Sequence, residues 1–104
     1  MKFTRIEDAP VVHKVAGVEG RKLAEGPVAN LVHICLEPGA VLEPHAIPLD
    51  ASFFILEGEA ELSSGGETAE ARPGMLFQSP RGTVHGFRNT GATRFRVLVI
   101  RGLM

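Results

Sequence analysis

Two histidines, His45 and His85, have the clearest capacity for metal or ligand chemistry in this sequence. Each follows a turn-forming stretch rich in proline and glycine, and each lies next to a short apolar run of the kind that forms a β-strand. Neutral imidazole is a common metal ligand, and sites for non-haem iron combine two histidines with a carboxylate. The pair therefore indicates either part of a metal site or the polar groups of a ligand pocket.

Two carboxylates are close enough in the sequence to complete a metal site. Glu43 lies two residues before His45, so both side chains would leave one face of a strand, about 6.5–7 Å apart. Asp50 would need a bulge to join them, since an offset of one residue reverses the face of a strand. For Glu43 we prefer the interpretation that it points to solvent at the mouth of the barrel, because glutamate is rarely buried. The alternative for Asp50 is that it lies in a plain turn.

Short β-strands are the elements expected to position these residues. Runs rich in Val, Ile, Leu, Phe and Thr alternate with Gly and Pro, a spacing typical of an all-β sandwich or barrel. No segment has the sustained 3.6-residue apolar repeat of a long helix. The turn SSGG (63–66) predicts a hairpin, since glycine adopts a positive φ at no steric cost. Strands are predicted near residues 11–15, 21–25, 29–37, 41–47, 51–57, 59–64, 67–72, 75–78, 84–89 and 93–101.

The stretch GMLFQSPRGTVHGFRN, residues 74–89, carries the most specific pattern in the chain. This pattern resembles the second motif of the cupin superfamily at every fixed position. The resemblance implies a jelly-roll β-barrel of two antiparallel sheets, in which His85 points inward as a metal ligand. We expect His85 to be buried, with Phe87 packed beside it on the same face of the strand. The fixed positions of the motif are Gly74, Pro80, Gly82, His85 and Asn89.

Residues 39–58 are similar to the first cupin motif in their backbone landmarks but not in all of their ligands. The landmarks Gly39, Pro44, His45 and Gly58 stand at the expected spacing. Where the family has a second histidine and a glutamate, this chain has Ile47 and Ala51. The resemblance extends over about residues 29–101, and we expect residues 1–104 to form one cupin domain.

Two histidines alone hold a first-row divalent ion poorly. The family site uses three histidines and one glutamate, and this chain keeps two of these four ligands. Losing a residue that only supports a ligand already lowers metal affinity by about 10–100-fold, so losing two ligands should lower it more. We therefore expect no cofactor at full occupancy, and a divalent metal (Zn, Mn, Fe or Ni) if any is bound. The candidate metal ligands are His45 and His85, with Glu43 as a possible third.

The apolar replacements favour a pocket for a small molecule, since ligand pockets are mostly apolar with a few polar groups. A metal-dependent enzyme of the dioxygenase or isomerase type, built on His45, His85 and a carboxylate from Glu43 or Asp50, is the alternative. A structural dimer without a ligand is a third possibility, because one fold hosts many functions. The predicted pocket lining is His45, Ile47, Ala51, Phe53, Ile55, His85 and Phe87.

Other polar residues give weaker indications. His33 and Cys35 would share one face of a strand, and both residue types bind soft metals. The reading we prefer is a core cysteine beside a hydrogen-bonded histidine. Arg81 or Arg88, near the expected mouth of the barrel, could hold an anionic ligand.

Composition limits the partners that this chain could have. Eleven basic and twelve acidic residues give a net charge of −1, which argues against a nucleic-acid surface. No apolar stretch approaches the roughly 20 residues of a membrane span, and a single cysteine fits a reducing compartment such as the cytoplasm. We expect a homodimer, because the apolar stretches APVVHKVAG and FRVLVI would be exposed sheet edges if they were left unpaired.

Overall fold

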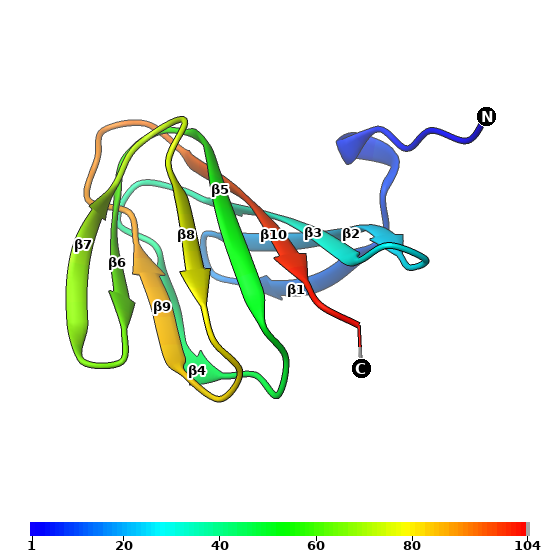
Figure 1. Cartoon of the computed structure of the whole chain (residues 1–104). Helices are drawn as coiled ribbons and strands as arrows, with labels where there is room; N and C mark the ends of the chain where they lie inside the picture. Colours follow the sequence, from blue (N-terminus) through cyan, green and yellow to red (C-terminus); the bar gives the residue numbers. More distant parts are fainter. Residues whose placement is uncertain (104) are drawn as a thin grey trace.

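The computed structural model describes residues 1–103, which form two antiparallel β-sheets facing each other (Figure 1). The larger sheet has the strand order β1-β2-β3-β10-β5-β8, and the smaller has the order β4-β9-β6-β7. This is the predicted all-β barrel of two antiparallel sheets. Residue 104 of the predicted domain lies outside the described residues. The strands are β1 (Val11–Val15), β2 (Val18–Glu25), β3 (Asn30–Leu36), β4 (Val41–Ala46), β5 (Ala51–Glu57), β6 (Ala60–Ser64), β7 (Glu67–Ala71), β8 (Leu76–Ser79), β9 (Val84–Arg88) and β10 (Phe95–Arg101).

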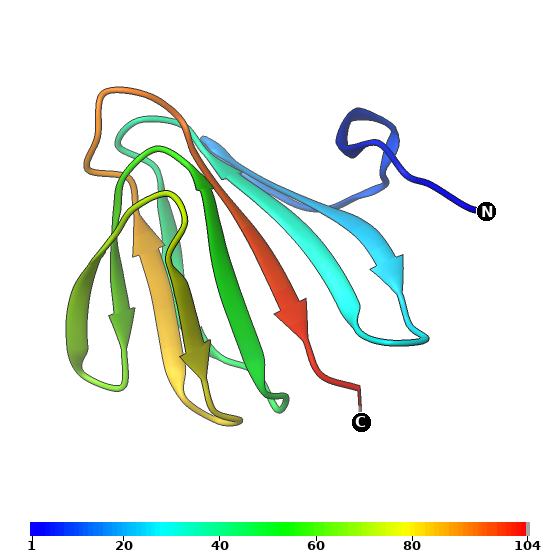
Figure 2. The same ribbon diagram turned by 45° about the horizontal axis from the view of Figure 1, so that its top comes forward.

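Helical structure is limited to one 3₁₀ turn, η1 (Ile6–Asp8), within residues 1–103. In that part of the chain no helix is long and apolar enough to cross a membrane. The β1–β2–β3 end of the larger sheet extends past the smaller sheet, as Figure 2 shows. One side of the barrel interior therefore opens between β4 and this extension.

The core lies between the two sheets and follows the two-residue period of the strands. On β5, Ala51, Phe53 and Ile55 are buried, while the residues between them are partly or fully exposed. On β10, Phe95, Val97 and Val99 are buried in the same way. The two strands pair along their length, with Val99 opposite Phe53. This register aligns the inward residues of both strands in rows across the sheet.

The strand β10 occupies the middle of the larger sheet, where it pairs with β3 on one side and β5 on the other. FRVLVI is therefore paired within the chain on both of its backbone edges, so it leaves no open edge for a partner. The strand β1, by contrast, is an open edge of the larger sheet. It pairs only with β2, and all five of its residues are exposed.

Two turns containing glycine set the positions of the site strands. Gly65 and Gly66 have φ values of 57° and 86° and join β6 to β7, as the hairpin prediction required. Before β9, the Thr83 N–H donates to the Pro80 carbonyl at 3.1 Å, and Gly82 has a φ of 80°. This second turn brings the chain into β9 with the His85 side chain facing the interior.

The buried Asn89 has a structural role at the end of β9. Its Nδ2 donates to the carbonyls of Leu36 and Thr93, both at 2.9 Å, and its Oδ1 accepts from the Gly91 N–H at 2.9 Å. These bonds connect the end of β9 to the end of β3 and fix the loop that leads to β10. The amide supplies both donors and acceptor, which explains an asparagine at this motif position.

Candidate functional site

His45 and His85 meet at the open end of the barrel. They are direct partners across β4 and β9, with ring centroids 5.1 Å apart. His85 is 4% exposed and packs against Phe53, at a centroid distance of 4.7 Å, so its expected burial is confirmed. Phe53 in turn contacts Phe87 edge-on at 5.3 Å. His45 is exposed, and its Nδ1 lies 3.1 Å from the Glu43 carbonyl oxygen.

Burial lowers the pKa of His85, and the nearby His45 and Arg101 lower it further, while the Thr83 backbone acts in the opposite direction. Its Nδ1 is buried and forms no hydrogen bond within residues 1–103. A buried polar atom without a partner is unfavourable, and it marks a position where a ligand atom could be accepted.

Glu43 is exposed, as the preferred solvent-facing interpretation required, and it lies next to a bulge in β4. Leu42 lies opposite Phe87 and His45 lies opposite His85, so three steps along β4 match two along β9. This bulge reverses the alternation between Leu42 and His45. Glu43 is consequently exposed at the rim of the barrel.

Gly86 allows the bulge, because the chain of β4 passes directly over it. A Cβ at residue 86 would lie 2.7 Å from the Leu42 carbonyl oxygen and 2.9 Å from the Pro44 nitrogen. Pro44 also lacks the N–H that a regular ladder would need. These two residues together explain why the two-residue period fails here.

Asp50 is engaged in a loop rather than in the site. Its Oδ1 accepts the Arg81 backbone N–H at 2.8 Å, and its own carbonyl accepts the Gly102 N–H at 2.9 Å. The side chain is exposed. The plain-turn alternative therefore describes Asp50 better than the bulged metal ligand.

The residues at this end of the barrel do not fit a divalent ion. Ile47 packs against the core, and Ala51 is 4% exposed, so neither supplies a lone pair. Within residues 1–103, no three His, Cys, Asp or Glu side chains are grouped so that they could hold a metal. The donors that remain are the two imidazoles, one fewer than the minimum for a non-haem iron site.

Arg101 is a site residue that the sequence interpretation missed. It lies on the inward face of β10, because it continues the alternation of Val97 and Val99. Its backbone is paired with Ala51, and Ala51 is paired with Ser79 on the other side. Ala51, at the position of the missing glutamate, therefore lies between an arginine and a serine.

The two arginines considered from the sequence lie elsewhere. Arg88 is exposed and pairs with Glu61 at 3.4 Å, on the outer face of the smaller sheet. Arg81 is an exposed residue of the loop before β9. The strict alternation of FRVLVIR was the signal that could have identified Arg101 instead.

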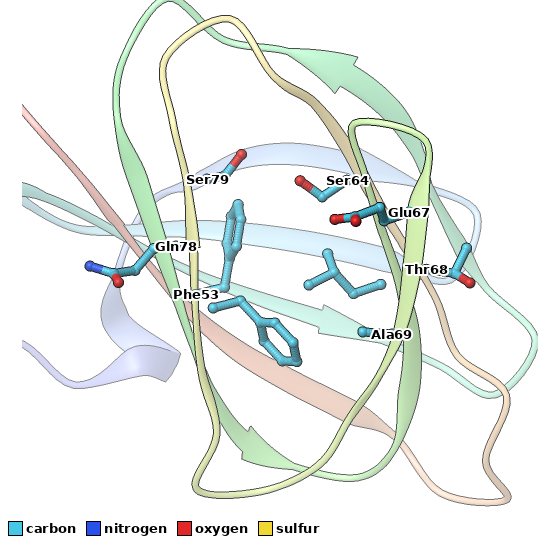
Figure 3. A pocket seen from close by; sticks show the side chains of 9 residues that line it. Phe53, Ser64, Glu67, Thr68, Ala69, Gln78 and Ser79 are labelled. Carbon is cyan, nitrogen blue, oxygen red and sulfur yellow. The ribbon is translucent and has the colours of Figure 1, made fainter.

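Two cavities flank the buried pair Phe53 and His85. The first has a volume of about 590 Å³ and lies between β5/β8 and β6/β7. In Figure 3 the oxygen atoms of Ser64, Glu67 and Ser79 point toward one end of this cavity, while Gln78 points away from it. The second, of about 640 Å³, lies between β4 and the β1–β2–β3 extension, and we call it the β3–β4 cavity. Its lining is Val12, His13, Val15, Gly20, Lys22, Val32, Ile34, Val41, Leu42, Glu43, Pro44, His45 and Arg101.

The predicted pocket residues do not gather around one cavity. Phe53 lines the first cavity and His45 lines the β3–β4 cavity. The core contains the other apolar members, Ala51, Ile55 and Phe87, with Ile47 packed against it. The predicted lining therefore does not match the lining of either cavity.

His33 and Cys35 lie on the outer face of the larger sheet, away from the barrel interior. The His33 Nε2 accepts a hydrogen bond from the Arg96 Nε at 3.0 Å, as the preferred interpretation required of a hydrogen-bonded histidine. Cys35 is half-buried rather than a core residue, and burial raises the pKa of its thiol. The raised thiol pKa argues against nucleophilic or metal chemistry at this pair.

His33 is expected to make the protein less stable in mild acid. Burial, and then the charge of Arg96, lower the pKa of His33; Arg94 and Arg21 act in the same direction and Glu19 against it. The unfolded chain therefore binds a proton more readily than the folded one, so the free energy of unfolding falls as the pH falls below about 6.5. Urea unfolding between pH 7.5 and 5 should show this decrease, and His33→Gln should make it smaller. If the free energy of unfolding decreased with pH equally in the natural protein and in His33→Gln, the attribution to His33 would be wrong.

Comparison with known proteins places the whole architecture in a known class. A family model described as a cupin domain matches residues 32–101. The KdgF structure from Halomonas sp. is similar with a TM-score of 0.84 and 21% identity, covering 100% of this chain and 96% of that one. A predicted oxalate decarboxylase from Thermotoga maritima gives a TM-score of 0.84 at 22% identity, over 100% of both chains.

A third structure, the polyketide cyclase RemF from Streptomyces resistomycificus, is 26% identical with a TM-score of 0.83. That similarity covers 98% of this chain and 79% of the cyclase. No curated protein matches the sequence. The decarboxylase and the cyclase have different stated activities, so the comparison defines the fold and leaves the function to be argued from the site.

Proposed function

This chain belongs to the cupin family, and we propose that it binds a small organic molecule in its barrel without using a metal ion. The observation that carries the proposal is the β3–β4 cavity beside His45. Its volume of about 640 Å³ is typical of small-molecule sites, which usually have about 300–1,000 Å³. Most of its lining is aliphatic, and its polar side chains are those of His13, Lys22, Glu43, His45 and Arg101.

The lack of carboxylate ligands supports the metal-free part of the proposal. Ile47 and Ala51 are apolar, Asp50 is bonded into a loop, and Glu43 is exposed beyond a bulge. The cationic Arg101 also lines the cavity, and its charge disfavours a second cation nearby. A metal-dependent dioxygenase or isomerase would need at least one carboxylate to move into the site.

The proposal can be tested by titrating the ¹⁵N-labelled protein with benzamide, a small neutral probe. We expect amide shifts to concentrate on β3, β4 and the end of β10. Val32 is an inward residue that lines the cavity, so Val32→Trp should fill it and weaken binding. Val28→Trp is the matched control, since Val28 is 91% exposed and lies outside the lining. Shifts confined to the first cavity, or equal effects of both variants, would contradict the proposal.

We also propose that the protein is a homodimer of this domain, formed through the β1 edge. The support is the edge position of β1 and the exposure of Val11, Val12 and Val15, which are 45%, 51% and 53% exposed. An apolar edge strand left open is a site for pairing with another chain. Multi-angle light scattering at micromolar concentration should give twice the mass of one chain. A species of single-chain mass alone would refute the dimer.

A further inference from the structure

The buried Nε of Arg101 distinguishes it from the other arginines of residues 1–103. Arg101 lies on the inward side of β10, partly buried, and its Nε is buried without a hydrogen-bond partner in residues 1–103. No carboxylate of residues 1–103 lies within 4.0 Å of it. Six arginines do lie within 4.0 Å of a carboxylate: Arg5, Arg21, Arg72, Arg88, Arg94 and Arg96.

Two further polar groups without partners lie at the same end of the barrel. Ser79 and His85 are both 4% exposed, and the Ser79 Oγ and His85 Nδ1 form no hydrogen bond within residues 1–103. Ser79, Ala51 and Arg101 follow one another across β8, β5 and β10. Arg101 and Ser79 thus flank Ala51, which carries only a methyl group.

We propose that Arg101 binds the carboxylate group of an organic acid whose carbon skeleton occupies the β3–β4 cavity, which Arg101 lines. This inference rests on the proposed function, because it names the class of ligand for the same cavity. A carboxylate accepts two parallel hydrogen bonds from a guanidinium and has further lone pairs for other donors. It would therefore give the Nε of Arg101 the hydrogen-bond partner that it lacks within residues 1–103.

The surrounding charges favour a monoanion. Within the lining of the β3–β4 cavity, Arg101 and Lys22 are the cations and Glu43 is the anion. Lys22 already lies 3.4 Å from Glu25, so Arg101 is the cation left for a ligand. Glu67 lines the first cavity on the far side of Ser79. A dianionic ligand such as phosphate would lie near these glutamates, and the single guanidinium of Arg101 would balance only one of its two charges. A ligand with one carboxylate group would be neutralised by Arg101.

The position of Ala51 gives the proposal a physical basis. The resemblance implies a glutamate there, which would hold a metal ion. This chain has alanine at that position, and its partner on the next strand is Arg101. The chain thus provides a positive charge at this end of the barrel from its own side chain.

The test compares benzoate with benzamide, which has the same shape without the charge, by NMR titration at fixed ionic strength. Benzoate should bind the natural protein at least about tenfold more tightly than benzamide, as expected for a charge-assisted bidentate contact. Arg101→Gln should remove this preference, because it should weaken benzoate binding much more than benzamide binding. Arg101→Lys should retain part of it, since the charge remains but the planar fork is lost.

Arg88→Gln is the matched control, because it removes one positive charge from the outer face of a neighbouring strand. It should leave the benzoate preference intact. Equal affinity for benzoate and benzamide, a preference that survives in Arg101→Gln, or inorganic phosphate binding as tightly as benzoate would each overturn the carboxylate site while the proposed pocket stands. If neither benzoate nor benzamide binds in the cavity, the proposed function itself fails.

Discussion

The double variant Ile47→His, Ala51→Glu is expected to bind one Zn²⁺ ion per chain, at least about 100-fold more tightly than the natural protein. Both positions face the interior: Ile47 packs against the core and Ala51 is 4% exposed. The new imidazole and carboxylate would join His45 and His85, whose rings are already 5.1 Å apart. This restores the ligand set that the cupin resemblance implies.

Arg101 should limit the affinity of that variant. It is paired across the strands with residue 51, so the new carboxylate would form an ion pair with it when no metal is bound. The ion pair also lowers the cost of burying the new carboxylate, which would otherwise be large. Adding Arg101→Gln should therefore tighten Zn²⁺ binding further and destabilise the metal-free protein.

Calorimetric titration with Zn²⁺, Mn²⁺ and Ni²⁺ is the measurement for all three proteins. Metal at a thousand times its dissociation constant should stabilise the double variant by about 4 kcal/mol. A double variant that binds no better than the natural protein would show that residues 47 and 51 do not occupy the family's ligand positions.

The substitution Gly58→Ala is expected to destabilise the fold far more than Gly39→Ala. Both glycines are landmarks of the first motif, and both have a positive φ, of 80° and 82°. A Cβ at residue 58 would lie 2.3 Å from the Arg94 carbonyl oxygen and 2.9 Å from the Cα of Phe95, whereas one at residue 39 would meet nothing within 4 Å. The backbone at the start of β10 would have to move.

Urea unfolding of the two variants separates conformational strain from the steric clash. Gly39→Ala should cost about 1–2 kcal/mol, the usual penalty of the left-handed region for an L-residue. Gly58→Ala should cost that amount and about 3 kcal/mol more, because overpacking against backbone is difficult to relieve. Since domains are stable by about 5–15 kcal/mol, Gly58→Ala could unfold much of the protein at ambient temperature. Equal losses in the two variants would contradict the steric explanation.

The strands could be predicted from local patterns because their signals are local. The alternation in ASFFILE indicated which side of β5 faces the core, and Gly65 and Gly66 indicated the β6–β7 hairpin. The start of β2 was placed three residues late, at residue 21 instead of Val18. Its first part, which includes Gly20, is weakly apolar and is held by pairing with β3 on one side and β1 on the other.

The site was harder to predict because it depends on contacts between distant segments. His85 was identified by its motif, but the exclusion of Glu43 required the bulge of β4, which forms against Gly86 more than 40 residues away. Arg101 became a site residue only through the register that places it beside Ala51, 50 positions earlier. Neither the bulge nor the register can be read from the spacing of residues within one strand.

Elemental analysis of the natural protein, purified without an affinity tag and without chelators, tests the metal-free site most directly. The account predicts divalent metal far below one ion per chain, because His45 and His85 are the only family ligand positions of this chain that keep a donor. A first-row metal retained near one ion per chain would contradict it, provided that the metal is lost in His45→Ala and His85→Ala.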